Sequence, residues 1–247
     1  MYRHTIKIGV LGGIGPEATS RFYDGLFRRL QQIGIDGNTS YPQVIVNSIP
    51  APELVGKISD DQLAPYRIGL TQLDDLGVDF IAMVCNTIHI YRDELQKSIR
   101  APIIDLREEV RRKLATENIK KITVLGTGQT IEQGLYAFPE MENVPISNED
   151  IQKLEMIIVN YNSGKDKKNT KYRIADVVDI AVKYINEGAE VVLLGCTEIA
   201  VMLKDVHIPK IDTLDVLIDA TIEHDRLENN RRVKIQYLFE NACGPDE

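Results

Sequence analysis

The sequence predicts an α/β protein made of two similar lobes, each with a parallel sheet, that face each other across a cleft. Apolar, β-rich segments alternate with longer helical segments along the chain, a pattern typical of parallel strands joined by helical crossovers. Short motifs of the first half recur in the same order about 110 residues later, which indicates an internal repeat. The 247 residues suffice to bury a core without disulfides or metals.

The first segments predict a β–α–β unit. We expect a strand at residues 6–11 (IKIGVL), because this apolar run is rich in β formers and stops at a glycine cluster. Pro16 and Glu17 suit the first turn of a helix, which we expect to close at Gly34. A second strand follows at residues 43–49.

The alternation then continues into the second half. In order we expect a helix at 60–77 with Pro65 in its early turns, a strand at 79–85, a helix at 88–99, a strand end at 102–106 and a helix at 107–118. Residues 120–126 begin the pattern again. Residues 164–171 (GKDKKNTK) predict a solvated loop, and the tail 228–247 can hold a helix or a strand.

Three pairs of motifs carry the internal repeat. IGVLGGIG at 8–15 matches ITVLGTGQ at 122–129, FIAMVCNTIH at 80–89 matches VVLLGCTEIA at 191–200, and APIIDL at 101–106 matches IPKIDTL at 208–214. We expect residues 1–114, completed by 213–247, to form the N-terminal lobe and residues 115–212 to form the C-terminal lobe. Ligands of open α/β sheets bind at the carboxyl ends of the strands, so the cleft is the predicted site.

Composition and charge limit the class of protein. The net charge of −8 argues against a nucleic-acid or membrane-surface role, because anionic polymers would be repelled. No apolar run approaches the roughly 18 to 20 residues that span a bilayer, and no signal peptide is visible. Three cysteines do not make a disulfide framework, so we expect the protein to be cytoplasmic. With nucleic acids and membranes disfavoured, we expect its partner to be a small molecule.

Two cysteines occupy equivalent places in the repeat. Cys85 and Cys196 each follow an apolar strand and precede a helix, so the two sulfurs are expected to flank one cleft from opposite sides. Exposed amides and the helix dipole are expected to lower the pKa of each thiol from about 8.5. Asn86, Thr87 and Thr197 add hydrogen-bond donors for a carboxylate or an enolate-like anion.

Such a pair suits inversion of a carbon stereocentre. One thiolate removes the proton α to a carboxylate from one face, and the other sulfur, as a thiol, delivers a proton to the opposite face. Because the protonation states are swapped after turnover, the pair serves both directions. Two carboxylates or two imidazoles could do similar work, but no second motif pair is placed so symmetrically.

The motifs also resemble those of a known family. LGGIGPEAT, VCNTIH and LLGCTEIA are similar to signatures of the aspartate/glutamate racemase superfamily, and most of all to its aspartate racemase branch; the resemblance spans residues 6–222. It implies a two-lobed α/β fold, no cofactor and a homodimer. It also implies that Cys85 and Cys196 are the opposed acid and base in racemisation of an amino acid, with aspartate in first place.

The resemblance assigns further residues to the substrate. Asn86, Thr87 and Thr197 match family positions that hold the substrate carboxylate. Thr127, in LGTGQTIEQGLY, matches a position that reaches the substrate, and Ile14 matches a position that lines the pocket. Glu198 has two readings, as an acid that favours a helix start or as the group that orients the substrate ammonium. His89 either tunes the Cys85 thiol or binds a nearby carbonyl, and Asp105 and Asp212 are interpreted as helix N-caps.

Two departures from the family pattern leave the substrate open. Residues 49–52 read Ile-Pro-Ala-Pro, so Pro52 stands where many aspartate racemases carry an arginine that grips the side-chain carboxylate. Asn162 or Ser163 stands where a lysine is usual, unless Lys165 takes its place. Glutamate or a broader set of amino acids is therefore the alternative to aspartate.

Three other classes of protein are compatible with parts of the sequence. Residues 13–18 fit the dinucleotide-binding pattern G-x-G-x-x-A, but the acid expected about 20 residues later is missing. A non-catalytic small-ligand binder would share the cleft but would not need sulfur on both sides, and retention of both cysteines argues against the single-cysteine decarboxylases of the superfamily. No CxxC or His–His pair predicts a metal site. Cys243, in the tail, is interpreted as a surface thiol without function.

Overall fold

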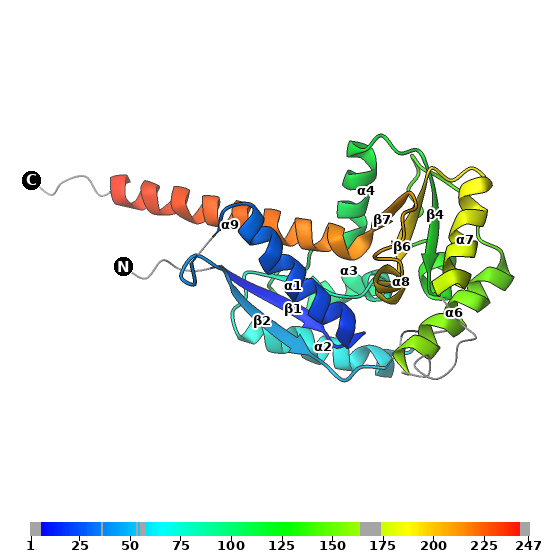
Figure 1. Ribbon diagram of the computed structural model, residues 1–247. Helices are drawn as coiled ribbons and strands as arrows, with labels where there is room; N and C mark the ends of the chain where they lie inside the picture. Colours follow the sequence, from blue (N-terminus) through cyan, green and yellow to red (C-terminus); the bar gives the residue numbers. More distant parts are fainter. Residues whose placement is uncertain (1–5, 36, 53, 55–57, 164–173, 243–247) are drawn as a thin grey trace, which may run out of the picture.

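The computed structural model of the protein describes residues 6–35, 37–52, 54, 58–163 and 174–242, with side chains as far as residue 232 (Figure 1). Two parallel sheets lie at its centre, and helices pack around them. The predicted α/β class is therefore confirmed. Cys243, Lys165 and the predicted loop at 164–171 lie outside the described residues.

The first sheet has the strand order β2-β1-β3, and all its strands are parallel. The elements of this half are β1 (Lys7–Gly12), α1 (Pro16–Gln32), β2 (Gln43–Ser48), α2 (Asp60–Asp75), β3 (Phe80–Met83), the 3₁₀ turn η1 (Thr87–Tyr91), α3 (Arg92–Leu95), the 3₁₀ turn η2 (Gln96–Ser98) and α4 (Leu106–Thr116). A parallel bridge between Ile81 and Ile103 continues the sheet beyond β3.

The second sheet repeats this arrangement, with the order β5-β4-β6-β7 and all strands parallel. Its elements are β4 (Lys121–Gly126), α5 (Gly128–Glu132), β5 (Glu142–Asn143), α6 (Asn148–Asn162), α7 (Ile174–Asn186), β6 (Val191–Gly195), α8 (Thr197–Met202), β7 (Lys210–Asp212) and α9 (Thr213–Ala242). β4 matches β1, β6 matches β3, and β7 pairs with β6 as Ile103 pairs with β3. The repeated motifs thus occupy equivalent places, as predicted.

One expected helix is broken. The segment 88–99 forms η1, α3 and η2 in place of a continuous helix. The side chain of Gln96 donates to the carbonyls of Ile99 and Ala101 and accepts from the amide of Ile103 at 2.7 Å. These contacts tie the end of the segment to the following turn.

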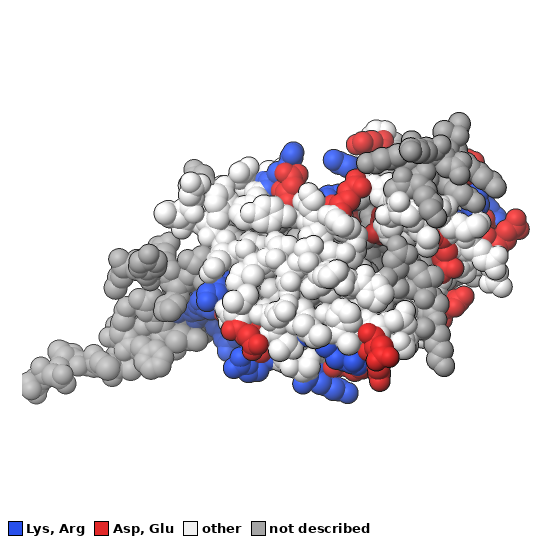
Figure 2. Space-filling model, turned by 90° about the horizontal axis from the view of Figure 1, so that it is seen from below, with Lys and Arg blue, Asp and Glu red and all other residues white. Residues whose placement is uncertain are grey.

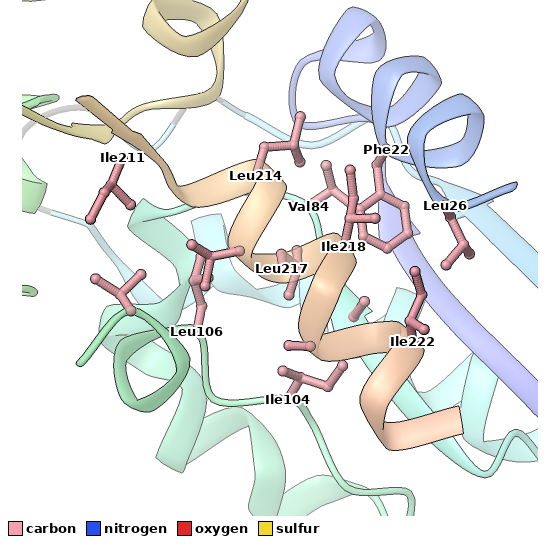
Figure 3. Packing of buried hydrophobic residues seen from close by; sticks show 14 of the residues in the cluster. Phe22, Leu26, Val84, Ile104, Leu106, Ile211, Leu214, Leu217, Ile218 and Ile222 are labelled. Carbon is pink, nitrogen blue, oxygen red and sulfur yellow. The ribbon is translucent and has the colours of Figure 1, made fainter. Parts of the chain in front are cut away.

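The helix α9 connects the second sheet to the helices of the first half. It starts directly after β7 and packs against α1 and α4. Figure 3 shows its apolar side chains among those of α1 and the start of α4; the labelled residues are Leu214, Leu217, Ile218, Ile222, Phe22, Leu26, Ile104, Leu106, Val84 and Ile211. Burial of one such side chain stabilises the fold by about 1.5–3 kcal/mol.

The position of α9 bears on the expected lobes. Its packing on α1 and α4 agrees with an N-terminal lobe completed by residues 213–247, although the lobe boundaries stay a prediction. Figure 1 shows the C-terminal part of α9 extending beyond the body of the molecule. The tail that sequence left open between helix and strand is therefore helical as far as Ala242.

Charged side chains are unevenly spread over one face of the molecule. Figure 2 shows a face whose centre is formed by uncharged side chains, with Lys and Arg next to Asp and Glu along the margin. On the described part of this face, basic side chains are thus not gathered into one patch. No helix within the described residues is both long enough and apolar enough to cross a membrane.

Candidate active site

A pocket of about 210 Å³ lies where β3 and β6 end. Every site residue predicted from the sequence lines it: Ile14, Cys85, Asn86, Thr87, Thr127, Cys196, Thr197 and Glu198. The rest of the lining comes from Gly13, Gly15 and Pro16 of the glycine loop (residues 12–16) and from Ala51, Leu54, Ile158 and Asn162. Pockets for drug-sized ligands enclose about 300–1,000 Å³, so this one suits a small metabolite.

Cys85 lies between the end of β3 and η1, and its side chain is partly buried. Burial raises the pKa of the Cys85 thiol to about 12. The backbone amide of Ile88 acts in the opposite direction, the negative charge of Glu198 raises this pKa further, and the amide and hydroxyl of Thr87 lower it. Burial is the largest of these effects, so Cys85 is a neutral thiol at pH 7.

Cys196 is the N-cap residue of α8 and is buried. Its thiol donates a hydrogen bond to Oε2 of Glu198 at 2.9 Å, and the hydroxyl of Thr197 donates to the same oxygen at 3.0 Å. Burial, the charge of Glu198 and this hydrogen bond all raise the pKa of Cys196 well above its ordinary value. The amides of Glu198 and Ile199 oppose them but are the smaller effects.

The expectation that helix ends lower both thiol pKa values is therefore wrong. The amides are in place, but η1 is a single 3₁₀ turn and α8 has only six residues. Such short elements add little dipole, and burial next to a carboxylate outweighs them. Cys85 and Cys196 are free, without a disulfide between them.

Three threonine hydroxyls meet at the pocket. Oγ1 of Thr87 lies 3.1 Å from Oγ1 of Thr127 and 3.2 Å from Oγ1 of Thr130, and Thr127 donates to Thr130 at 3.1 Å. Thr87 follows the first sheet, whereas Thr127 and Thr130 follow β4 of the second. The cluster thus joins the two repeats beside the cysteines. Thr130 was not predicted; its only signal was its position three residues after Thr127, whose hydroxyl caps α5.

The Asn86 side chain is also held from the second repeat. It is 2% exposed, and its Oδ1 accepts a hydrogen bond from the hydroxyl of Tyr136. Tyr136 closes the motif LGTGQTIEQGLY, but no role was predicted for it.

Two glycines of the glycine loop are closely packed, Gly15 against Glu198 and Gly13 against Ile49. Gly15 has φ = 94°, and a Cβ at this position would lie 2.5 Å from Oε1 of Glu198. A Cβ at Gly13, where φ is 89°, would lie 2.4 Å from the carbonyl oxygen of Ile49. Both positions therefore require glycine. The Glu198 carboxylate also lies next to Gly15, the N-cap residue of α1. In a dinucleotide-binding protein the pyrophosphate binds at this end of the helix.

Other predicted residues have structural contacts. Nε2 of His89 lies 3.3 Å from the carbonyl oxygen of Met83, and burial lowers the pKa of His89 to about 4. This contact fits the carbonyl-binding reading. Asp105 caps α4, as predicted, and Asp212 accepts from a backbone amide at the start of α9 at 2.9 Å. Within the described residues, no group of three His, Cys, Asp or Glu side chains could hold a metal ion.

The departures from the family pattern bear on one side of the pocket. Asn162, at the expected lysine position, lines the pocket. Pro52, at the expected arginine position, follows the lining residue Ala51, and its carbonyl accepts a hydrogen bond from the Tyr66 hydroxyl at 2.6 Å. None of the described lining residues is Lys or Arg. Lys165 lies outside the described residues.

The sequence profile of the Asp/Glu/hydantoin racemase family matches residues 11–221. The chain belongs to this family. Among its relatives, the broad specificity amino-acid racemase RacX of Bacillus subtilis is 28% identical over 222 residues, which cover 87% of this chain and 96% of that protein. Family membership and this relative indicate an isomerase of the amino-acid racemase class, which confirms the predicted type of enzyme.

Solved structures of the family share the fold of this racemase. An aspartate racemase homologue from Pyrococcus horikoshii has a TM-score of 0.68 at 24% identity, covering 89% of this chain and 99% of that chain. The aspartate racemase of Picrophilus torridus has a TM-score of 0.72 at 22% identity, covering 89% and 94%. These likenesses confirm the two-sheet α/β architecture.

Proposed function

We propose that this racemase inverts the α-carbon of a free amino acid by moving protons between Cys85 and Cys196. The observation that carries the proposal is the shared pocket: each thiol comes from one repeat, and both line the same small cavity. The same lining carries hydroxyl and amide groups that suit an anionic substrate. A planar carbanion held there could exchange a proton on either face.

The polar lining supplies the anchors for a substrate. The hydroxyl of Thr87 and the amide N–H groups of Asn86 can donate to the α-carboxylate and to the negative charge that grows on it when the α-proton leaves. The hydroxyls of Thr127 and Thr197 can do so when they turn away from Thr130 and Glu198, to which they donate in this structure. The buried Glu198 carboxylate can pair with the α-ammonium as the substrate binds. After it has taken the Cys196 proton, its other oxygen can still accept a hydrogen bond from the ammonium. For Glu198 this is one of the two readings that the sequence left open.

A bound substrate also explains how a raised thiol pKa can be overcome. A nearby ammonium favours the thiolate, opposing the effect of Glu198. The Cys196 proton passes to Oε2 of Glu198, 2.9 Å away, and leaves a thiolate. The thiolate takes the α-proton, the electron pair moves into the carboxylate as an enolate, and the Cys85 thiol returns a proton to the opposite face. This turnover leaves Cys85 as the thiolate, with Cys196 and Glu198 protonated. The Cys85 thiolate can then take the α-proton of the other enantiomer while the Cys196 thiol returns one to the opposite face, and Cys196 regains the proton held by Glu198. For repeated turnover in one direction, Glu198 releases its proton to solvent and Cys85 takes one from solvent.

Aspartate is the substrate predicted from the sequence. A second candidate, amino acids with uncharged side chains, is favoured by the lining. Ile14, Ala51, Leu54 and Ile158 are apolar, and the described lining offers no cation for a side-chain carboxylate. A relative named for broad specificity supports a substrate range wider than aspartate alone.

Chiral chromatography of a substrate panel tests the proposal. Both enantiomers of aspartate, glutamate, alanine, leucine and methionine are incubated with the full-length protein, without added cofactor. A kcat/KM for aspartate above that for leucine and methionine supports the first candidate, and the reverse order supports the second. Absence of racemisation across the panel contradicts the proposed function.

A further inference from the structure

The hydroxyl of Tyr136 reaches across the two repeats to a pocket residue. Tyr136 lies between α5 and β5, is 2% exposed and belongs to the largest apolar core cluster. It does not line the pocket itself. Its hydroxyl nevertheless donates a hydrogen bond to Oδ1 of Asn86, which follows β3 and does line the pocket.

This hydrogen bond distinguishes the two ends of the Asn86 amide. The oxygen is engaged by Tyr136, whereas the Nδ2 group has no acceptor among the described residues. If the amide turned over, an oxygen lone pair would take the place of the N–H donors. A carboxylate substrate would then meet an acceptor where it needs a donor, at the cost of one hydrogen bond and added repulsion.

Tyr136 is suited to hold this orientation. Its ring is packed in the core, so the hydroxyl has little freedom to move. Burial raises the pKa of Tyr136 well above its ordinary value, which keeps the hydroxyl protonated and able to donate.

We propose that Tyr136 is a positioning residue that fixes the Asn86 amide with its N–H donors toward the substrate carboxylate. The inference rests on the proposed function, since it gives Asn86 a carboxylate to bind. It makes the orientation of a donor in the first repeat depend on a residue of the second.

A double-mutant cycle tests this role. Tyr136→Phe, Asn86→Ala and the double variant are compared with the wild type in the racemisation assay, with thermal unfolding followed for each. We expect Tyr136→Phe to lower kcat/KM by about tenfold, the effect of one misplaced donor to a charged group. In the Asn86→Ala background the same change should lower kcat/KM by less than about twofold, because the amide it orients is gone.

A matched tyrosine serves as the control. The Tyr184 hydroxyl is also buried and bonded, to Asp150 at 2.7 Å, but Tyr184 does not line the pocket. Tyr184→Phe should change stability while leaving kcat/KM within about twofold. Tyr136→Met offers a second side chain without a hydroxyl if the phenylalanine variant does not fold.

Two results would overturn the positioning role: an equal loss from Tyr136→Phe with and without Asn86, or a folded Tyr136→Phe with wild-type kcat/KM. Cys85→Ser and Cys196→Ser are run in the same assay. If these variants lose racemisation and Tyr136→Phe does not, only the role of Tyr136 fails. If they keep racemisation, the proposed function itself fails.

Discussion

The thiol of Cys196 donates a hydrogen bond to the carboxylate of Glu198, with 2.9 Å between Sγ and Oε2. A negative charge so close to sulfur disfavours the thiolate, and the buried setting strengthens the effect. The same carboxylate offers the nearest acceptor for the thiol proton. Glu198 therefore holds Cys196 protonated and, in the proposed reaction, receives its proton.

Replacing Glu198 by glutamine separates these two effects. Without the charge, the pKa of Cys196 should fall toward its ordinary value, so iodoacetamide should alkylate Cys196 faster at pH 8 than in the wild type. Racemisation should nevertheless fall by about a hundredfold, because the proton acceptor is lost. Peptide mass spectrometry and chiral chromatography measure the two rates.

The matched control is Glu190→Gln, since Glu190 accepts a backbone amide at 2.9 Å without lining the pocket. It should change neither rate. Unchanged alkylation in Glu198→Gln, or racemisation at the wild-type rate, would contradict the role given to this carboxylate.

The raised pKa of Cys85 predicts an unusual pH profile. Only the thiolate is alkylated, and burial raises the Cys85 pKa to about 12. In Cys196→Ser, alkylation of Cys85 should therefore rise by about tenfold per pH unit from pH 8 to 11 without a plateau. Peptide mapping keeps Cys243 separate. A plateau of the alkylation rate near pH 9 would show that Cys85 has an ordinary thiol pKa and would contradict this prediction.

The contact between Gly15 and Glu198 predicts a strong effect of a single methyl group. In Gly15→Ala the new Cβ would lie 2.5 Å from Oε1 of Glu198 on a backbone with φ = 94°. Both strain and the displaced carboxylate should lower racemisation by about tenfold or more and stability by about 1–3 kcal/mol. Gly34→Ala, at φ = 85° with no atom within 4 Å, carries strain alone. Equal activity in the two variants would refute the contact.

Asp225 predicts a pH-dependent stability. This α9 residue is 4% exposed, and burial raises its pKa from 3.8 to about 6, with Asn229 lowering it and Asp79 raising it. A raised folded-state pKa contributes stability below pH 4 that is lost as the pH rises through 6. Asp225→Asn should thus raise the unfolding free energy by about 2–3 kcal/mol at pH 7 and little at pH 4. Urea unfolding at both pH values measures this, and an equal gain at both would contradict it.

The sequence predicted which residues meet at the pocket because an internal repeat fixes equivalent positions in space. Once Cys85 and Cys196 were matched, their shared cleft followed from the parallel sheets, and so did the places of Asn86, Thr87 and Thr197. The homodimer and the cytoplasmic location stay predictions, which sedimentation and cell fractionation would test.

Features set by contacts between distant segments could not be predicted. The thiol pKa values depend on burial and on the orientation of the Glu198 carboxylate. Neither can be read from the motif LLGCTEIA alone. Thr130 and Tyr136 reach the site through contacts across the repeats. The end of the segment 88–99 is likewise held by bonds that Gln96 makes to residues beyond it.

The central claim is that two sulfurs act on opposite faces of one carbon. Each enantiomer of the best substrate is incubated in D₂O with wild type, Cys85→Ser and Cys196→Ser, and α-deuterium is followed by NMR with chiral chromatography alongside. We predict deuterium in both enantiomers with wild type, and racemisation reduced by at least about a hundredfold in each variant. Any residual exchange should be confined to one enantiomer, and to opposite enantiomers in the two variants. Racemisation at a near wild-type rate in either variant would contradict the two-thiol mechanism.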